Sequence, residues 1–117
     1  MTLRATCHCG AIELTLTEAA PLETAKRCDC SFCKRRQGAN ISVPLHALKV
    51  TKGAENLGVY SWHTHTAKHY FCKICGIYTH HQRRAATDEY GVNIGCLEDV
   101  SPADLEPIPT TDGRNYA

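Results

Sequence analysis

Seven of the eight cysteines in this 117-residue chain fall into three short clusters. The clusters are Cys7-His8-Cys9, Cys28-Asp29-Cys30-Ser31-Phe32-Cys33 and Cys72-Lys73-Ile74-Cys75. Four cysteine thiolates close a tetrahedral zinc site, whereas three leave one position for an exchangeable ligand. The seven cysteines divide naturally as four plus three. The sequence therefore predicts one closed and one open zinc site, and the open site is the one suited to chemistry.

The closed site is expected to combine the first and third clusters. Cys72 and Cys75 are followed by Gly76, and this pattern is typical of a zinc knuckle because both thiolates then face one ion from a tight turn. Cys7 and Cys9 form a second pair that also ends in a glycine. Two alternatives stay open for the third cluster. One is a redox dithiol, although the βαβ pattern expected around such a motif is absent, and the other is iron held by four thiolates.

The open site is expected on the second cluster. Cys28, Cys30 and Cys33 lie within six residues, so one turn of chain can occupy three corners of a tetrahedron. A zinc ion held in this way lowers the pKa of an external thiol and makes it a thiolate at neutral pH. The competing interpretation is a second structural site with a fourth protein ligand. The candidates for that ligand are Cys96, His46, His63, His65 and His69.

Five basic residues surround the second cluster, and we call them the basic flank. They are Lys26, Arg27, Lys34, Arg35 and Arg36. One interpretation is an ordinary solvated surface. The other is a patch that attracts an anionic thiol and keeps the cysteines deprotonated. A zinc-finger interpretation would direct the same patch to phosphate, but the formal net charge of only +1 and the lack of a recognition helix argue against a nucleic-acid partner.

The histidines do not form a recognisable catalytic motif. Among His63, His65, His69, His80 and His81, none has the His-Glu-x-x-His spacing of metalloproteases. Each of them alone is more often a histidine on a strand surface than a ligand. One of them can serve as a proton shuttle beside the open site, but the sequence does not indicate which.

The elements expected to position these residues are short. Alternating apolar and polar residues predict a half-buried strand over 11–18, and β-branched or aromatic content predicts further strands. The further strands are expected at 39–43, 48–51, 59–66, 69–71, 77–80 and 92–94. A short helix is expected over 31–37 with Gly38 as its stop, and a helix start at 101–105. These elements predict an all-β fold with little helix, in a single domain over residues 1–117.

Composition indicates the cellular location in which we expect this protein. No apolar stretch approaches the roughly 20 residues of a membrane span, and the first nine residues lack the basic head and apolar run of a secretory signal. We therefore expect a cytoplasmic protein, in which cysteines indicate metal binding or catalysis rather than disulfides. Large apolar residues are scarce, with two Phe, one Trp and one Met, so metal binding is expected to contribute to folding.

The three clusters together resemble the glutathione-dependent formaldehyde-activating enzyme (Gfa) family, also called the centromere-protein-V-like family. The segments 7–10, 27–33 and 71–76 look like the signatures of that family, in its order. Weaker similarity lies at Gly38, Gly53, Leu57 and Tyr60, and residues 93–99 are similar to a further family stretch. The resemblance covers the chain from about Cys7 to Asp99. It implies an Mss4-like zinc-binding fold.

The resemblance also implies where the ions bind. It places a structural zinc on Cys7, Cys9, Cys72 and Cys75. It places a second, labile zinc on Cys28, Cys30 and Cys33, where glutathione binds.

The implied activity is the addition of glutathione, or a similar thiol, to formaldehyde or another small aldehyde. The reaction is classed as carbon–sulfur lyase chemistry, and Lys34, Arg35 and Arg36 would hold the carboxylates of the tripeptide. A variant has glutathione displace the second zinc and pair with a freed cysteine, with Cys30 the first choice. The chain is shorter than the founding members of the family. The alternative is a non-enzymatic zinc-stabilised module that binds glutathione, a protein or nucleic acid; the sequence does not give an oligomeric state.

Overall fold

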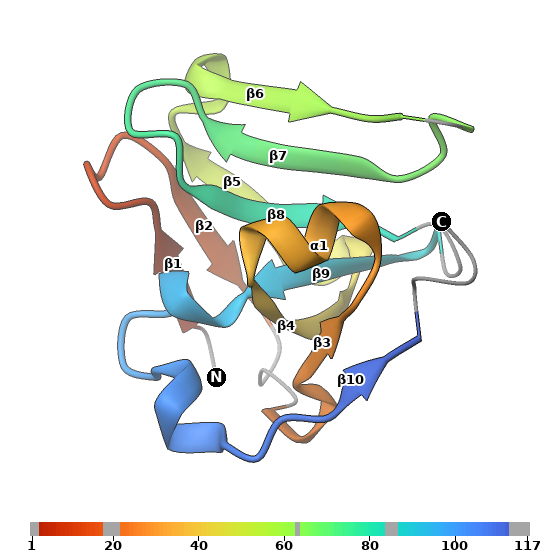
Figure 1. Cartoon of the computed structure of the whole chain (residues 1–117). Coiled ribbons are helices and arrows are strands. Elements are labelled where there is room, and N and C mark those ends of the chain that lie inside the picture. The colour runs from red at the N-terminus through yellow and green to blue at the C-terminus, as the bar shows by residue number, and fades with distance from the viewer. Residues whose placement is uncertain (1–2, 18–21, 63, 84–86, 113–117) are drawn as a thin grey trace.

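The computed structural model describes residues 3–17, 22–62, 64–83 and 87–112. Within these ranges the chain is mostly β-strand, in one sheet of three strands and one of seven, with a single α-helix (Figure 1). The smaller sheet has the order β1 (Leu3–Thr6), β2 (Glu13–Leu16), β5 (Leu48–Lys52). The larger sheet has the order β10 (Thr110–Thr111), β3 (Lys26–Cys28), β4 (Ala39–Pro44), β9 (Glu89–Asn93), β8 (Tyr78–Gln82), β7 (Lys68–Cys72), β6 (Leu57–Tyr60). Short 3-10 helices span Leu22–Thr24, Leu45–Ala47, Ala54–Asn56, Ile94–Cys96 and Pro102–Leu105.

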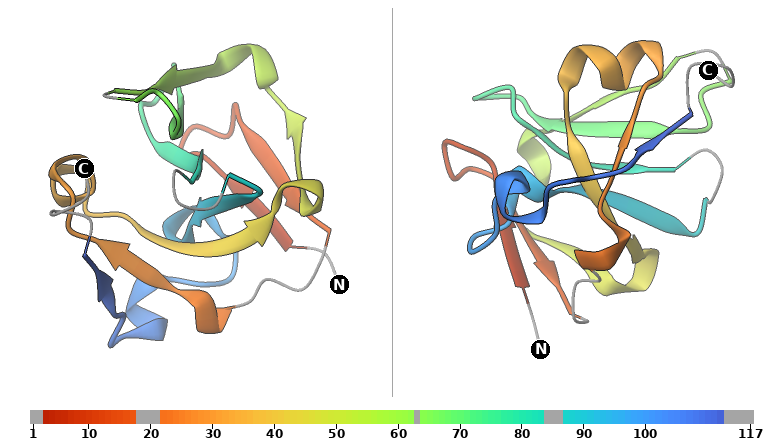
Figure 2. Two further views of the ribbon diagram at one scale, coloured as in Figure 1. Left: turned by 90° about the vertical axis from the view of Figure 1, so that its right-hand side faces the viewer. Right: turned by 60° about the horizontal axis from the view of Figure 1, so that its bottom comes forward.

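The all-β, Mss4-like zinc fold expected from the sequence is confirmed. Neighbouring strands pair antiparallel throughout, except that β10 runs parallel to β3. The left view of Figure 2 shows the three strands of the smaller sheet together on one side of the larger sheet. Residues 7–9 follow β1 of the smaller sheet, and residues 72–75 begin at the end of β7 in the larger sheet. The two segments are 65 positions apart in sequence, and the arrangement of the sheets brings their cysteines together.

The core lies between the two sheets. Leu14 and Leu16 of β2 are fully buried, as their alternation with polar residues predicts, and they face Ile41 of β4 and Val92 of β9 in one cluster. Each fully buried side chain of this size contributes about 1.5–3 kcal/mol to folding. Cys72 belongs to the same cluster, so one group of cysteines is built into the edge of the core.

The helix α1 (Ser31–Arg36) ends two residues before the predicted stop at Gly38. Gln37, and not Gly38, adopts the left-handed conformation, with φ of 55°, and its backbone N–H donates to the carbonyl of Cys33 at 2.8 Å. A polar side chain tolerates this conformation when it bonds locally, and the Gln37 amide does so with the carbonyl of Lys34. The expected helix over 31–37 is therefore confirmed in place, while its stop signal was assigned to the wrong residue.

The strand predicted over 59–66 is wrong in its boundaries. The structure has a hairpin of β6 and β7 in register Leu57 with Cys72 and Tyr60 with His69. The chain leaves the strand after Tyr60 and turns at His65, whose φ is 57°. The sequence pattern predicted a strand that is too long because the turn is made by a histidine rather than by glycine or proline. Strands β1, β3 and β10 were not predicted. The last two matter for the site because β3 carries Cys28 and β10 pairs with β3.

Candidate metal sites

The four-cysteine group consists of Cys7, Cys9, Cys72 and Cys75. All four Sγ atoms lie within 4.8 Å of one another. The separations from Cys7 to Cys9 and from Cys9 to Cys72 are both 3.7 Å. A tetrahedral zinc with Zn–S bonds of about 2.3 Å holds its sulfurs about 3.8 Å apart. The group thus fits a closed four-thiolate ion as it stands, as the sequence predicted.

Two turns of the same shape present these cysteines. Gly10 follows the first pair and Gly76 follows the second, and both have φ of 80°. Nothing lies within 4 Å of a Cβ built at either position, so the backbone conformation alone requires glycine there. The prediction that Gly76 supplies a conformation unfavourable to other residues is therefore confirmed.

Backbone amides stabilise negative charge on this group. The N–H of Ile12 donates to Cys7 Sγ at 3.3 Å, and the N–H of Ile74 donates to Cys72 Sγ at 3.4 Å. Backbone hydrogen bonds from Cys9 and Ile77 lower the pKa of Cys75 to about 6. These hydrogen bonds favour the ionised form of Cys75, and ionised thiols are the form that binds metal.

The three-cysteine group consists of Cys28, Cys30 and Cys33, whose Sγ atoms also lie within 4.8 Å of one another. Cys28 ends β3, Cys30 is the N-cap of α1 and Cys33 lies in its first turn. The Cys30 sulfur accepts the backbone N–H of Cys33 at 3.3 Å, as a capping side chain does. Cys30 and Cys33 are buried, and Cys28 is half-buried. One strand end and one helix start therefore present all three ligands.

The expected fourth-ligand candidates do not join this group within the described residues. His46, His65, His69 and Cys96 are absent from it, and His63 lies outside the described residues. Cys96 is buried elsewhere: its thiol donates to the Tyr78 carbonyl at 3.5 Å. Burial, and next the nearby Cys7 sulfur, raise the pKa of Cys96 to about 12, so it stays a neutral thiol.

The environment of the three-cysteine group suits a cation. Burial raises the pKa of Cys33 to about 12, and the nearby Arg36 acts in the opposite direction. Burial also raises the pKa of Cys30, but hydrogen bonds from Cys33 and Phe32 outweigh it and lower the value. Three clustered thiols can all be ionised in such a place only when positive charge compensates them. A zinc ion supplies that charge, so the residues fit the metal.

The basic flank divides into two kinds of residue. Arg36 points into the protein: its Nη2 donates to Cys33 Sγ at 3.2 Å and its Nη1 to His69 Nδ1 at 3.0 Å. Arg35 is exposed and its Nη1 donates to the carbonyl of Ser31 on its own helix at 2.7 Å. The sequence placed positive charge beside the cysteines but did not show that Arg36 contacts a sulfur. The signal was the three-residue spacing from Cys33, which puts both on one face of a helix.

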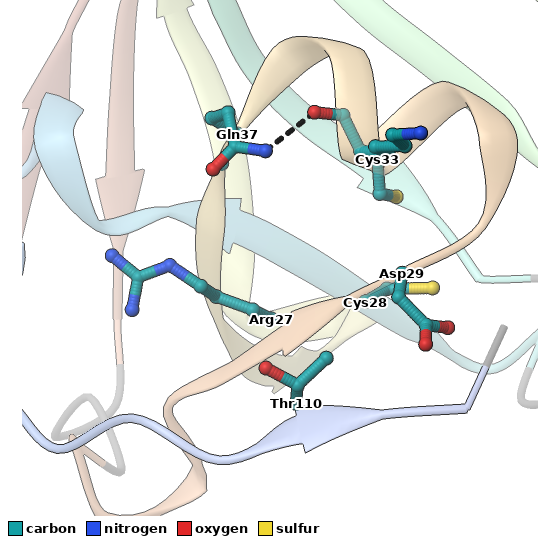
Figure 3. A pocket seen from close by; sticks show the side chains of 8 residues that line it. Arg27, Cys28, Asp29, Cys33, Gln37 and Thr110 are labelled. Carbon is teal, nitrogen blue, oxygen red and sulfur yellow. Dashed lines mark hydrogen bonds between the residues drawn. The ribbon is translucent and has the colours of Figure 1, made fainter.

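A surface pocket of about 140 Å³ borders the three-cysteine group. Figure 3 shows it between α1 and the strands β3 and β10, with the Cys33 sulfur directed from the helix toward β3. The residues that line it are Arg27, Cys28, Asp29, Cys33, Lys34, Gln37, Gly38 and Thr110. Lys34 and Arg27 therefore share a pocket with two of the three cysteines, whereas Arg35 and Arg36 do not line it. Arg27 is also paired with Glu106 at 3.1 Å.

On its other side α1 meets a cluster of rings that the sequence did not reveal. Phe32 packs against Tyr60, Trp62 and His69, with centroids 5.4, 5.0 and 4.6 Å away. His69 is buried, and burial followed by the charge of Arg36 lowers its pKa to about 4. His69 is therefore neutral at pH 7. Because a guanidinium only donates, Nδ1 accepts from Arg36 and the ring proton sits on Nε2.

Comparison with known proteins identifies a family and a similar solved structure. A family model described as glutathione-dependent formaldehyde-activating enzyme matches residues 2–111. A crystal structure of a Rhodobacter sphaeroides protein, a structural genomics target, is 51% identical and superposes with a TM-score of 0.88. That match covers 95% of this chain and 100% of the other. Across the described residues, every helix is too short to serve as a membrane span.

Proposed function

Because this chain belongs to the glutathione-dependent formaldehyde-activating enzyme family, we propose that it condenses glutathione, or a similar thiol, with formaldehyde or another small aldehyde. The reaction is of the carbon–sulfur lyase type. The observation that supports the proposal most directly is the three-cysteine group, which offers three ligands where the other group offers four and borders a pocket lined by Lys34 and Arg27.

In this proposal the two groups divide the work. Cys7, Cys9, Cys72 and Cys75 hold a structural zinc, and Cys28, Cys30 and Cys33 hold a labile one. A zinc ion at the second place, when bound, supplies Lewis-acid character and lowers the pKa of a nearby thiol. Two of the three ligands, Cys30 and Cys33, are buried, so exchange is expected from the side of the half-buried Cys28.

The pocket residues orient the thiol. Glutathione carries carboxylates, and Lys34 and Arg27 place two cations on the pocket that contains Cys28 and Cys33. Lys34 is exposed, whereas Arg27 is paired with Glu106. We assign carboxylate binding to Lys34 first, with Arg27 as a second contact. Arg35, which is turned back onto its own helix, is left outside the site.

The proposed reaction requires few functional groups from the protein. A thiolate attacks the aldehyde carbon, one carbon–sulfur bond forms, the carbonyl π electrons move to oxygen, and that oxygen takes one proton. No oxidant or reductant is needed. The chain therefore has to bind and orient a thiol near its ionised form, because the aldehyde carbon is already electrophilic.

We further propose that residues 1–117 act as one domain in the cytoplasm. Cys7 and Cys72, which come from distant parts of the sequence, lie in one core cluster, and this supports a single unit.

The experiment is a rate measurement with metal counting. Zinc-loaded protein is mixed with glutathione and ¹³C-formaldehyde, and the appearance of S-hydroxymethylglutathione is followed by NMR against the uncatalysed rate. We expect acceleration that Cys28→Ser abolishes and Cys96→Ser leaves unchanged, because the Cys96 thiol belongs to neither group. Glutathione binding without acceleration would instead favour the non-enzymatic module, and neither binding nor acceleration would reject both.

A further inference from the structure

We propose that Arg36 is a positioning residue of the three-cysteine group: its guanidinium gives the Cys33 sulfur a fixed positive partner, which allows an anionic thiol to bind beside three thiolates. The inference rests on the proposed function, since it concerns the same open site. It gives Arg36 a task other than contact with the carboxylates of a substrate.

The contact itself is specific. Arg36 Nη2 lies 3.2 Å from Cys33 Sγ, and Nη1 of the same guanidinium lies 3.0 Å from His69 Nδ1. One planar group therefore joins a candidate metal ligand on α1 to a neutral histidine on β7. The histidine can only accept from it, so the guanidinium is held with its second nitrogen directed at the sulfur.

The side chain of Arg36 also packs against two aromatic rings. The guanidinium carbon lies 3.7 Å from the ring centroid of Tyr78 and 4.5 Å from that of Phe32. Its Nε is buried without a hydrogen-bond partner among the described residues, a cost that a solvated surface arginine would not bear. The rest of the structure therefore keeps this cation beside Cys33 at some expense.

Charge counting shows what the cation changes. Three thiolates and a divalent ion carry a net charge of −1, and an added thiolate would bring the site to −2. Arg36 reduces each of these values by one unit of negative charge. In a partly buried place an uncompensated charge is far more costly than in water, so this cation favours the entry of an anionic ligand.

The other cysteine group has a different arrangement. Within the described residues, the donors to the Cys7 and Cys72 sulfurs are backbone amides and neighbouring thiols. A group that is complete with four ligands receives no further anion. The guanidinium is thus found at the group that, under the proposed function, must accept one.

The test uses the full chain loaded with Co²⁺, which reports thiolate bonds through sulfur-to-cobalt charge-transfer absorption. The variants are Arg36→Gln and Arg36→Lys, with Arg35→Gln as the matched control, because Arg35 precedes Arg36 on the helix and is exposed. The probe is 2-mercaptoethanol, which has no carboxylate, so that charge at the sulfur is measured apart from binding by Lys34. The four-cysteine group contributes equally to every spectrum and cancels in the differences.

Removing the cation raises the energy of the sulfur lone pairs. We expect the charge-transfer band of Arg36→Gln to move to lower energy, and its apparent Kd for 2-mercaptoethanol to rise at least about tenfold, as loss of a unit charge a few ångströms away implies. Arg36→Lys should restore part of both, since it keeps the charge without the planar fork. Arg35→Gln should match the wild type.

Each other result counts against a definite claim. An unmoved band in Arg36→Gln, or equal effects from Arg35→Gln, overturns the inference. If the wild type binds 2-mercaptoethanol and Arg36→Gln binds it equally well, only the inference fails. If the wild type binds no thiol, the proposed function fails and the inference with it. Should Arg36→Gln not fold by circular dichroism, Arg36→Lys decides: a shifted band and a raised Kd without unfolding would support the inference, and a band and an affinity identical to the wild type would overturn it.

Discussion

Replacement of Cys72 by serine should unfold this protein, whereas replacement of Cys30 by serine should not. Cys72 is completely buried in the core, and its sulfur lies 3.7 Å from that of Cys9. Cys30 is the N-cap of a helix of six residues. Both residues are ligands of a candidate zinc ion, but they are connected to the fold in different ways.

The magnitudes separate the two changes. Binding of a structural zinc contributes about 10–16 kcal/mol in small domains, and the whole net stability of a domain is about 5–15 kcal/mol. Loss of one of four thiolates removes a large part of that contribution, and a serine hydroxyl in the core at Cys72 adds an unsatisfied polar group. Together these exceed the stability available.

The change at Cys30 costs little by the same reasoning. The Cys30 sulfur accepts the N–H of Cys33, and serine is among the best residues for that capping bond. We expect Cys30→Ser to change the free energy of unfolding by less than about 1 kcal/mol, while it weakens metal at the three-cysteine group and abolishes glutathione binding.

The assay is guanidinium unfolding of zinc-loaded protein, followed by circular dichroism, with isothermal titration of glutathione. Cys96→Ser serves as a control for cysteine loss without ligand loss, although its burial makes a modest destabilisation expected. If Cys30→Ser and Cys72→Ser unfold equally, or if Cys72→Ser remains folded, the division into a structural and a reactive site is refuted.

Three further predictions follow from the structure. Burial lowers the pKa of His80 from 6.5 to about 4, so the unfolded chain binds more protons between those values: the stabilisation is complete above pH 6.5 and is lost as pH falls toward 4. This pH-dependent part amounts to at most about 3 kcal/mol. When the free energy of unfolding in urea is plotted against pH between 7.5 and 5, the slope should be shallower in His80→Gln than in the wild type. Equal slopes would contradict the prediction. Gly76→Ala forces alanine into φ of 80° and should lower the free energy of unfolding by about 1–2 kcal/mol. Gly95→Ala, which is exposed and free of that constraint, should be near neutral when both variants are unfolded in urea. A chelator added to zinc-loaded protein should remove one ion first with ellipticity unchanged and the second with unfolding, as measured by a zinc dye and circular dichroism together; simultaneous loss of both ions would argue against unequal sites.

Local features of this protein could be predicted from sequence because their physical cause is local. Cys28, Cys30 and Cys33 lie within six residues, so any turn there gathers them, and the structure does so with a strand end and a helix cap. Gly76 was expected to carry an unusual backbone, and it does. By contrast the strand over 59–66 was misplaced, because a turn at His65 carries no glycine or proline signal.

The pairing of Cys7 and Cys9 with Cys72 and Cys75 was a choice among partners distant in sequence. The spacing indicated four ligands of the right kind, and the structure confirmed that packing of the two sheets brings them within 4.8 Å. Cys96 illustrates the opposite case. As a residue type it suited the second group equally well, and only its burial beside the Tyr78 carbonyl removes it.

The sequence by itself determined which atoms can hold metal and how they divide, since ligand chemistry and short spacings do not depend on distant contacts. The tertiary structure alone decided which way the charges face. Arg35 and Arg36 are adjacent and chemically identical, yet one lies in solvent and the other reaches Cys33 and His69. That difference arises because α1 packs one face against the rings on β7 and β8, and a one-residue step along a helix rotates a side chain by about 100°.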